Sequence, residues 1–171
     1  MTHLLYFTSL LQPATAVTNP GHLPFIPIYF EGVQVSWQTR SIAKNAKLKY
    51  VSCAKAREVI EHKTILYQTP PTDLIILCEG VFDVWKVNKA GFDATCCFGI
   101  EYKQAQINQL KKYAQVVIFF DEEIQAQKQA KKVKRLLDFS GCQTTIIQPV
   151  PGEDPGSMNV QQIKEKLKKY Q

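Results

Sequence analysis

The sequence predicts an α/β protein in which a small β-rich lobe precedes a parallel sheet of four strands flanked by helices. From position 72 onward, apolar strand-like runs alternate with helical patterns. Those runs are almost uninterrupted and aliphatic, which is typical of parallel strands covered on both faces. Residues 1–70 are irregular and hold five of the nine prolines. We therefore expect an N-terminal lobe over residues 1–70 and a second domain over 71–171, separated at Pro70-Pro71.

The N-terminal lobe is expected to contain three short strands and one short helix. Aliphatic and aromatic residues dominate three runs, as they do in strands. These runs are 25–30 (FIPIYF), 33–38 (VQVSWQ) and 48–52 (LKYVS). Glu31-Gly32 provides the turn of a hairpin between the first two strands. A short helix is predicted over 53–62.

The second domain is expected to repeat a strand and a helix four times, which places its strands parallel in one sheet. The predicted strands are 74–79, 93–98, 116–120 and 144–150, and the predicted helices are 81–90, 103–114, 122–139 and 158–169. Gly91 ends the first of these helices and Ser157 caps the last. The third helix has an inward stripe of small and aliphatic residues. The stripe consists of Ala126, Ala130, Val133 and Leu137.

The composition is that of an ordinary globular protein with a basic surplus. Of the 171 residues, 21 are basic and 15 acidic, which gives a net charge of +6 and favours a polyanionic partner such as nucleic acid. The five cysteines have no C-x-x-C spacing, so we expect small buried hydrophobic residues in a reducing cytoplasm and no structural zinc. The opening segment MTHLLYFTSLLQPATA lacks the basic start of a secretion signal, and no segment is long enough to span a membrane.

Carboxylates follow three of the predicted strands. LIILCEGVFD carries Glu79 and Asp83, FFDEE carries Asp121, Glu122 and Glu123, and EDP carries Glu153 and Asp154. Because the carboxyl ends of parallel strands share one edge, these acids are expected to lie together. Clustered acids repel unless a cation neutralises them, and oxygen-only ligands suit Mg²⁺ or Mn²⁺. Two such ions serve phosphodiester chemistry.

The acids have a second explanation, and the glycine beside Glu79 has a role of its own. Acids at helix starts are also common because they complement the helix dipole, and this explanation stays open for Asp83, Glu122 and Glu123. Gly80, next to Glu79, leaves room for a phosphate or a neighbouring strand to approach the backbone.

In this order, the motifs resemble the Toprim domain, which bacterial-type DNA primases, topoisomerases and certain nucleases share. Within that group the sequence resembles most the catalytic core of bacterial-type primases, including phage-encoded forms. Upstream, FIPIYFEGVQVSWQTRSI resembles two primase strands that lead to an arginine, here Arg40. Lys47-Leu48-Lys49-Tyr50 resembles the K-P-K-Y element of the family. The resemblance covers residues 25 to about 165 and includes His62-Lys63.

The resemblance implies a role for each of these side chains. Glu79 would be the acid or base, with Asp83 beside it as a second catalytic carboxylate. The implied ligands of one or two Mg²⁺ or Mn²⁺ ions are Glu79, Asp121, Glu123 and Asp154. The implied contacts to nucleotide or template are Arg40, Lys47, Lys49, Tyr50 and Lys63. Tyr50 and Trp37 are also aromatic candidates for stacking on a base, although an aromatic residue in a small β lobe more often belongs to the core.

The sequence departs from the family pattern at three positions. Glu123 replaces the second aspartate of the D-x-D motif, and Ala126 stands where a glycine usually follows it. Gly156 replaces the last acid of D-P-D. The zinc-binding head and the helicase-docking region of primases have no counterpart in the sequence. These departures bear on autonomous priming more than on metal binding.

The function expected from the resemblance is a primase-type nucleotidyltransferase, which joins ribonucleotides on single-stranded DNA in (phage) DNA replication. Its partners would be the template, nucleoside triphosphates and a replicative helicase, in the cytoplasm of a bacterial host cell and without a membrane. Two alternatives stay open. One is a Toprim nuclease that uses the same acids. The other is a non-enzymatic replication accessory that binds DNA or a helicase through the basic stretches 131–135 and 164–170.

Overall fold

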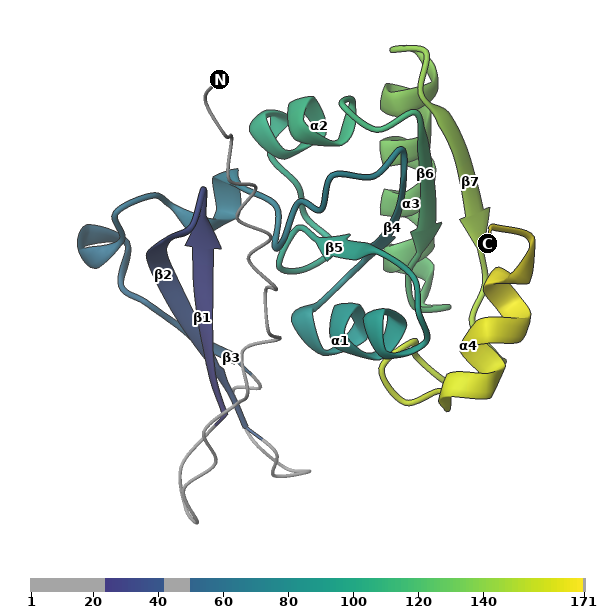
Figure 1. Ribbon diagram of the computed structural model, residues 1–171, viewed down its shortest axis with the longest axis horizontal. Coiled ribbons are helices and arrows are strands. Elements are labelled where there is room, and N and C mark those ends of the chain that lie inside the picture. Colours follow the sequence, from purple (N-terminus) through teal and green to yellow (C-terminus); the bar gives the residue numbers. More distant parts are fainter. Residues whose placement is uncertain (1–23, 42–49, 171) are drawn as a thin grey trace, which may run out of the picture.

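The computed structural model describes residues 24–41 and 50–170. They form two sheets, shown on the left and right of Figure 1: an antiparallel sheet of three strands and a parallel sheet of four. Helices flank the parallel sheet, which confirms the predicted fold class. The boundary between residues 70 and 71 stays a prediction.

The N-terminal sheet has the strand order β1-β2-β3. Its strands are β1 (Phe25–Phe30), β2 (Val33–Arg40) and β3 (Tyr50–Ser52). Glu31 and Gly32 form the hairpin turn with φ values of 49° and 81°, the left-handed pair that suits right-twisted strands. β2 is longer than predicted and ends on Arg40, which lies opposite Tyr50. Residues 48 and 49 of the predicted third strand lie outside the described residues.

The helix predicted over 53–62 is wrong. The segment instead holds two short 3₁₀ turns, η1 (Lys55–Arg57) and η2 (His62–Thr64). The reason is that β2 binds this segment. The N–H groups of Cys53 and Val59 donate to the carbonyls of Trp37 and Val35, both at 2.9 Å, so they cannot join a helical ladder. Tertiary pairing here outweighs local helix propensity.

The parallel sheet has the strand order β5-β4-β6-β7. Its strands are β4 (Leu74–Cys78), β5 (Ala94–Cys96), β6 (Gln115–Phe119) and β7 (Gln143–Ile147). The helices are α1 (Val81–Lys89), α2 (Gln104–Leu110), α3 (Ile124–Asp138) and α4 (Val160–Leu167), followed by the 3₁₀ turn η3 (Lys168–Tyr170). Most of these strands and helices are shorter than predicted. β5 stops at Cys96 because Phe98 adopts a left-handed backbone with φ of 60°.

The cap predicted for the last helix is also wrong. Asn159 caps α4, since its side chain accepts the N–H of Gln162 at 3.0 Å. Ser157 instead bonds to Asp154, whose Oδ1 accepts the Ser157 N–H at 2.6 Å. The loop that carries Asp154 is therefore closed on itself before α4 begins.

Two apolar cores lie on opposite faces of the parallel sheet. On one face, α1 and α4 pack together with the N-terminal sheet, so Ile26 and Ile28 of β1 share a core with Val84. On the other face lie α2 and α3. The predicted stripe of α3 is buried there, with exposed fractions of 2% or less at all four positions. Because the N-terminal sheet shares the α1 core, its strands are held close to the carboxyl end of β4.

Two further expectations from the sequence concern the cysteines and the membrane. All five cysteines are buried and none forms a disulfide. In the described ranges no helix has both the length and the apolarity to cross a bilayer. The opening segment, and with it the expectation about a secretion signal, lies outside the described residues.

Candidate active site

The first part of the site is the loop that leaves β4. Glu79 follows the fully buried Cys78, and Gly80 precedes the first turn of α1. The N–H of Gly80 donates to Asp83 Oδ2 at 2.9 Å, so Asp83 is turned back toward the end of β4. This contact is the helix-start role that the alternative explanation predicts for Asp83. It also brings the second acid next to the first.

The second part is the end of β6. The N–H of Asp121 donates to Glu79 Oε1 at 2.9 Å, which joins the ends of two neighbouring strands through the side chain of an acid. Gln127 of α3 supports this turn by donating to the carbonyl of Asp121 at 2.6 Å. Sequence analysis missed Gln127, because an amide within a polar helix gives no signal of its partner.

The third part is the loop after β7. A Cβ atom at Gly156 would lie 2.6 Å from Asp83 Oδ1 and 3.2 Å from Asp154 Oδ1, so both carboxylates face the same small space. Gly156 is therefore more than a missing ligand. The space that a third side chain would take is filled by Asp83, whose close approach depends on the bare backbone of Gly156.

The charges of these acids act on one another. The pKa of Glu79 is raised to about 7, first by burial and then by the charges of Asp121, Asp83 and Glu123, while the Asp121 N–H opposes the rise. The pKa of Asp83 is likewise raised to about 7, mainly by burial. The charges of Asp121 and Asp154 add to that shift, while the Gly80 N–H and Arg40 oppose it. The pKa values of Glu79 and Asp83 are thus both raised by the charges of neighbouring acids.

The remaining acids of the region have different positions. Glu123 is exposed at the start of α3, and its charge reaches Glu79. Glu122 accepts the N–H of Gly152 at 2.9 Å, so it holds the loop after β7. Glu153 accepts from Gln162 at 3.3 Å. Glu122 and Glu153 therefore serve the scaffold in this structure.

The donors suit a divalent cation chemically, although they are not gathered into a preformed cage. All four predicted ligands supply carboxylate oxygens, and the raised pKa of Glu79 reflects its burial next to other negative charges, which a cation would offset. Within residues 24–41 and 50–170, no three Asp, Glu, His or Cys side chains converge closely enough to hold a metal. Metal binding at these residues stays a prediction.

Arg40 and Tyr50 lie beside the acids. The Arg40 guanidinium lies 5.2 Å from the ring centre of Tyr50 and 4.2 Å from that of Phe82, the residue before Asp83. Tyr50 Oη would lie 3.3 Å from a Cβ at Gly80. Burial raises the pKa of Tyr50 to about 12, with Arg40 lowering it and Asp83 raising it. The N-terminal sheet thus delivers a cation and a phenol to the acid site.

The other predicted contacts differ in position. Lys63 donates from Nζ to the carbonyl of Phe98, in the turn after β5. The next residue, Gly99, donates its N–H to the carbonyl of Glu79 at 2.8 Å, so Lys63 lies near the same edge. Trp37 stacks on Phe25, with ring centres 5.8 Å apart, and lines a groove on the N-terminal sheet away from the acids. Lys47 and Lys49 lie outside the described residues.

Comparison with known proteins gives a family for part of the chain. Residues 76–158 match the family model described as Toprim-like. Among proteins with a curated function, none matches the sequence.

Solved structures share the fold over most of the chain. The zinc-binding and RNA polymerase domains of the Aquifex aeolicus primase match 86% of this chain and 39% of that one, with a TM-score of 0.73 and 24% identity. A DnaG catalytic core matches with a TM-score of 0.70 and 18% identity, over 86% and 51% of the two chains. The primase fragment of the bacteriophage T7 primase-helicase protein matches with a TM-score of 0.59 and 14% identity, over 86% of this chain and 64% of that one. The chain thus spans from 39% to 64% of these proteins.

Proposed function

We propose that the Toprim-like segment and the sheet before it form a primase-type nucleotidyltransferase core, an enzyme that joins ribonucleotides on single-stranded DNA. The observation that carries the proposal is the hydrogen bond from the Asp121 N–H to Glu79 Oε1, which places two of the three acid-bearing strand ends in contact. The third end faces Asp83 across Gly156. Acids from separate strands at one edge of a parallel sheet suit the binding of the cations that serve phosphoryl transfer.

Glu79, Asp121, Glu123 and Asp154 would hold one or two Mg²⁺ or Mn²⁺ ions. When bound, these ions supply positive charge for the phosphate oxygens and for the entering and leaving oxygens of the reaction. Glu79 Oε1 accepts the Asp121 N–H, which leaves Oε2 as the atom to take the proton of the 3′-hydroxyl as that oxygen attacks the α-phosphate and pyrophosphate leaves. Asp83 acts beside Glu79 as the second carboxylate.

The basic and aromatic residues of the N-terminal sheet would bind the nucleotide and the template. The Arg40 guanidinium contacts two aromatic rings, which limits its motion and orients its donors for a phosphate. The hydroxyl of Tyr50 lies near Gly80, beside the acids. Lys63 is assigned to the triphosphate on the β5 side of the site, and Lys47 and Lys49 to the same substrate or to the template backbone. The net charge of +6 favours the polyanionic template.

The proposed setting is DNA replication, with nucleoside triphosphates, single-stranded DNA and a replicative helicase as partners. The T7 relative is described as part of a primase-helicase protein, which supports the helicase as a partner. We assign the protein to the cytoplasm, in the bacterial host cell if a phage encodes it.

The test is primer synthesis on a single-stranded template with ribonucleotides and Mg²⁺ or Mn²⁺, alone and with the helicase. Glu79→Gln and Asp121→Asn are expected to abolish the product, because each removes a charge from the centre of the cluster. If the protein degrades DNA or RNA without added nucleotides and makes no primer, the nuclease is the correct function. If it makes no product and binds DNA equally well in EDTA, with Glu79→Gln unchanged, it is an accessory.

A further inference from the structure

Between β3 and β4, the structure buries a hydrogen-bonded pair of an acid and a histidine that plays no part in the proposed chemistry. Glu58 and His62 have side chains only 2% and 7% exposed, and His62 Nδ1 bonds to Glu58 Oε1. Ser36 Oγ donates to the same oxygen at 2.5 Å. Burial opposes ionisation of Glu58, but the bonds from Ser36 and His62 outweigh it and lower its pKa. A buried carboxylate is costly to desolvate unless it is hydrogen-bonded, so the position of Glu58 depends on these two partners.

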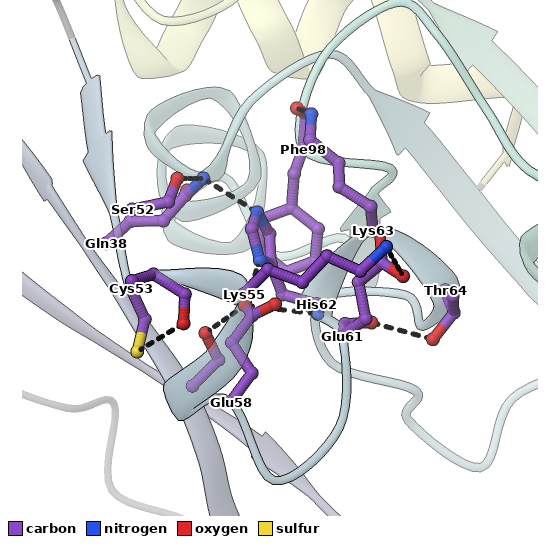
Figure 2. A network of polar contacts seen from close by, with 12 residues as sticks. Gln38, Ser52, Cys53, Lys55, Glu58, Glu61, His62, Lys63, Thr64 and Phe98 are labelled. Carbon is purple, nitrogen blue, oxygen red and sulfur yellow. Dashed lines mark hydrogen bonds and ion pairs between the residues drawn. The ribbon is translucent and has the colours of Figure 1, made fainter.

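The far side of the imidazole connects to the N-terminal sheet. Gln38 Nε2 lies 3.4 Å from His62 Nε2 and donates to Ser52 Oγ at 3.0 Å (Figure 2). With the Gln38 amide as donor, His62 Nε2 accepts and Nδ1 carries the hydrogen that Glu58 receives. His62 is therefore fixed from both sides, by β2 and β3 on one side and by Glu58 on the other.

His62 also touches the turn that supports the acid site. Its ring meets the ring of Phe98 edge-on, with centres 5.1 Å apart, and Figure 2 shows Lys63 reaching the carbonyl of the same Phe98. The ring of Tyr67 also packs edge-on against the ring of Phe98, with centres 5.9 Å apart. Phe98 has a left-handed backbone, with φ of 60°, which an aromatic residue adopts only when its surroundings impose it.

The strained turn leads directly to the catalytic acid. Gly99 follows Phe98 and donates its N–H to the carbonyl of Glu79 at 2.8 Å. A continuous set of contacts therefore runs from Glu58 through His62 and Phe98 to Glu79. Lys63 joins this set of contacts at the same turn, because its Nζ donates to the carbonyl of Phe98.

We propose that Glu58 and His62 are positioning residues, which hold Lys63 and the Phe98–Gly99 turn in the geometry that binds the triphosphate next to Glu79. Neither residue touches substrate. This inference rests on the proposed function, because it assigns the positioned Lys63 to a nucleotide. It differs from a purely structural role in one respect: loss of the pair must act on nucleotide binding through Lys63.

The experiment compares Glu58→Gln with Glu61→Gln in the full chain. Glu61 is a matched control, because it is also an acid of this segment but pairs with Lys55 and Lys103 on the surface. For Glu58→Gln we expect the KM for ATP in primer synthesis to rise about tenfold with kcat changed less than about twofold, as for the loss of one charged contact. For Glu61→Gln we expect no change. A lower melting temperature for Glu58→Gln with an unchanged KM overturns the inference.

A double-mutant cycle with Lys63→Met separates positioning from general damage. If Glu58 acts through Lys63, Glu58→Gln adds no further rise in KM once Lys63 is methionine. If the double variant shows a rise in KM equal to the product of the rises in the two single variants, the inference is overturned. Should Glu58→Gln fail to fold, Ser36→Ala removes one hydrogen bond from Glu58 and is expected to raise the KM about threefold, the effect of a weaker single bond; a folded Ser36→Ala with an unchanged KM overturns it too.

Calorimetric titration with ATP and Mn²⁺ gives a readout that needs no primer synthesis. The dissociation constants are expected to follow the same pattern as KM. If the unsubstituted protein binds ATP with this pattern but makes no primer, the proposed function fails and the positioning role stands. If the unsubstituted protein binds no ATP, the positioning role fails as well.

Discussion

Asp121 and Glu79 are joined by a hydrogen bond of 2.9 Å, from the backbone N–H of the first to the side chain Oε1 of the second. The bond favours the ionised form of Glu79, while its burial and the neighbouring acids favour the neutral form. The result is a carboxyl group fixed in place with a pKa near neutral pH. Position and proton affinity are thus set by the same turn.

The first prediction concerns pH and the stability of the metal-free protein. Glu79 and Asp83 have pKa values of about 7 in the folded chain and ordinary values of 4.5 and 3.8 when unfolded. Between about 4 and 7 the folded state therefore binds more protons than the unfolded state, so stability falls as the pH rises through this window. Urea unfolding in EDTA from pH 5 to pH 8 measures this loss.

The same measurement on Asp83→Asn tests the cause. Asparagine keeps an oxygen for the Gly80 N–H but removes the charge, so the variant should lose less stability between pH 5 and pH 8 than the unsubstituted protein. Asp138→Asn is the matched control, because Asp138 pairs with Lys134 on the surface. Equal slopes for all three proteins would contradict the cluster.

The second prediction concerns divalent cations. At pH 8, Mg²⁺ or Mn²⁺ should raise the melting temperature, because a cation at the acids binds the folded state only. At a concentration one hundred times the dissociation constant the gain is about 2.7 kcal/mol. Thermal melts with and without EDTA measure it. Asp121→Asn should reduce the gain and Asp138→Asn should retain it, and an equal gain in both would place the cation elsewhere.

The acids at the strand ends could be predicted because the rule that places them is local. Each follows an aliphatic run, and parallel strands bring their carboxyl ends to one edge. The same reasoning predicted the buried stripe of α3 from its period. A local sequence pattern of this kind is enough to predict where its residues lie in the fold.

Features that depend on a distant partner could not be predicted. The helix expected over 53–62 is absent because β2 takes the N–H groups of Cys53 and Val59. The closeness of Gly156 to Asp83 is set by how two loops meet, and no spacing in the sequence encodes it. The burial of Glu58 under His62 is of the same kind, because a charged residue beside a lysine-rich segment ordinarily indicates surface.

The third prediction concerns Arg40. Arg40→Lys keeps the charge but loses the contact of the guanidinium with the rings of Tyr50 and Phe82, so it is not conservative here. We expect the KM for ATP to rise about tenfold and the free energy of unfolding to fall by no more than about 1 kcal/mol, the scale of an exposed cation–π contact. Steady-state primer synthesis and urea unfolding check the two values. Arg57→Lys, in η1 and outside the site, is the control, and an equal KM in both variants would remove Arg40 from the nucleotide site.

The fourth prediction concerns the space between Gly156 and Asp83. Gly156→Ala places a Cβ 2.6 Å from Asp83 Oδ1, so the carboxylate or the loop must move. We expect a loss of about 1–3 kcal/mol in stability, as for other overpacked sites. Gly156→Asp, which restores the D-P-D pattern of the family, should lose at least as much and should not gain activity, because its side chain competes with Asp83 for one space.

A double-mutant cycle isolates the contact. In an Asp83→Ala background the space is open, so Gly156→Ala should cost less than about 0.5 kcal/mol, the level at which independent sites add. Urea unfolding of the four proteins at pH 7 gives the coupling energy. If Gly156→Ala is equally costly with and without the Asp83 carboxylate, the strain lies in the loop itself and the two residues do not share the space. A coupling energy near the full cost would place Asp83 and the loop that carries Asp154 in direct contact, which is the geometry on which the third acid-bearing strand end depends.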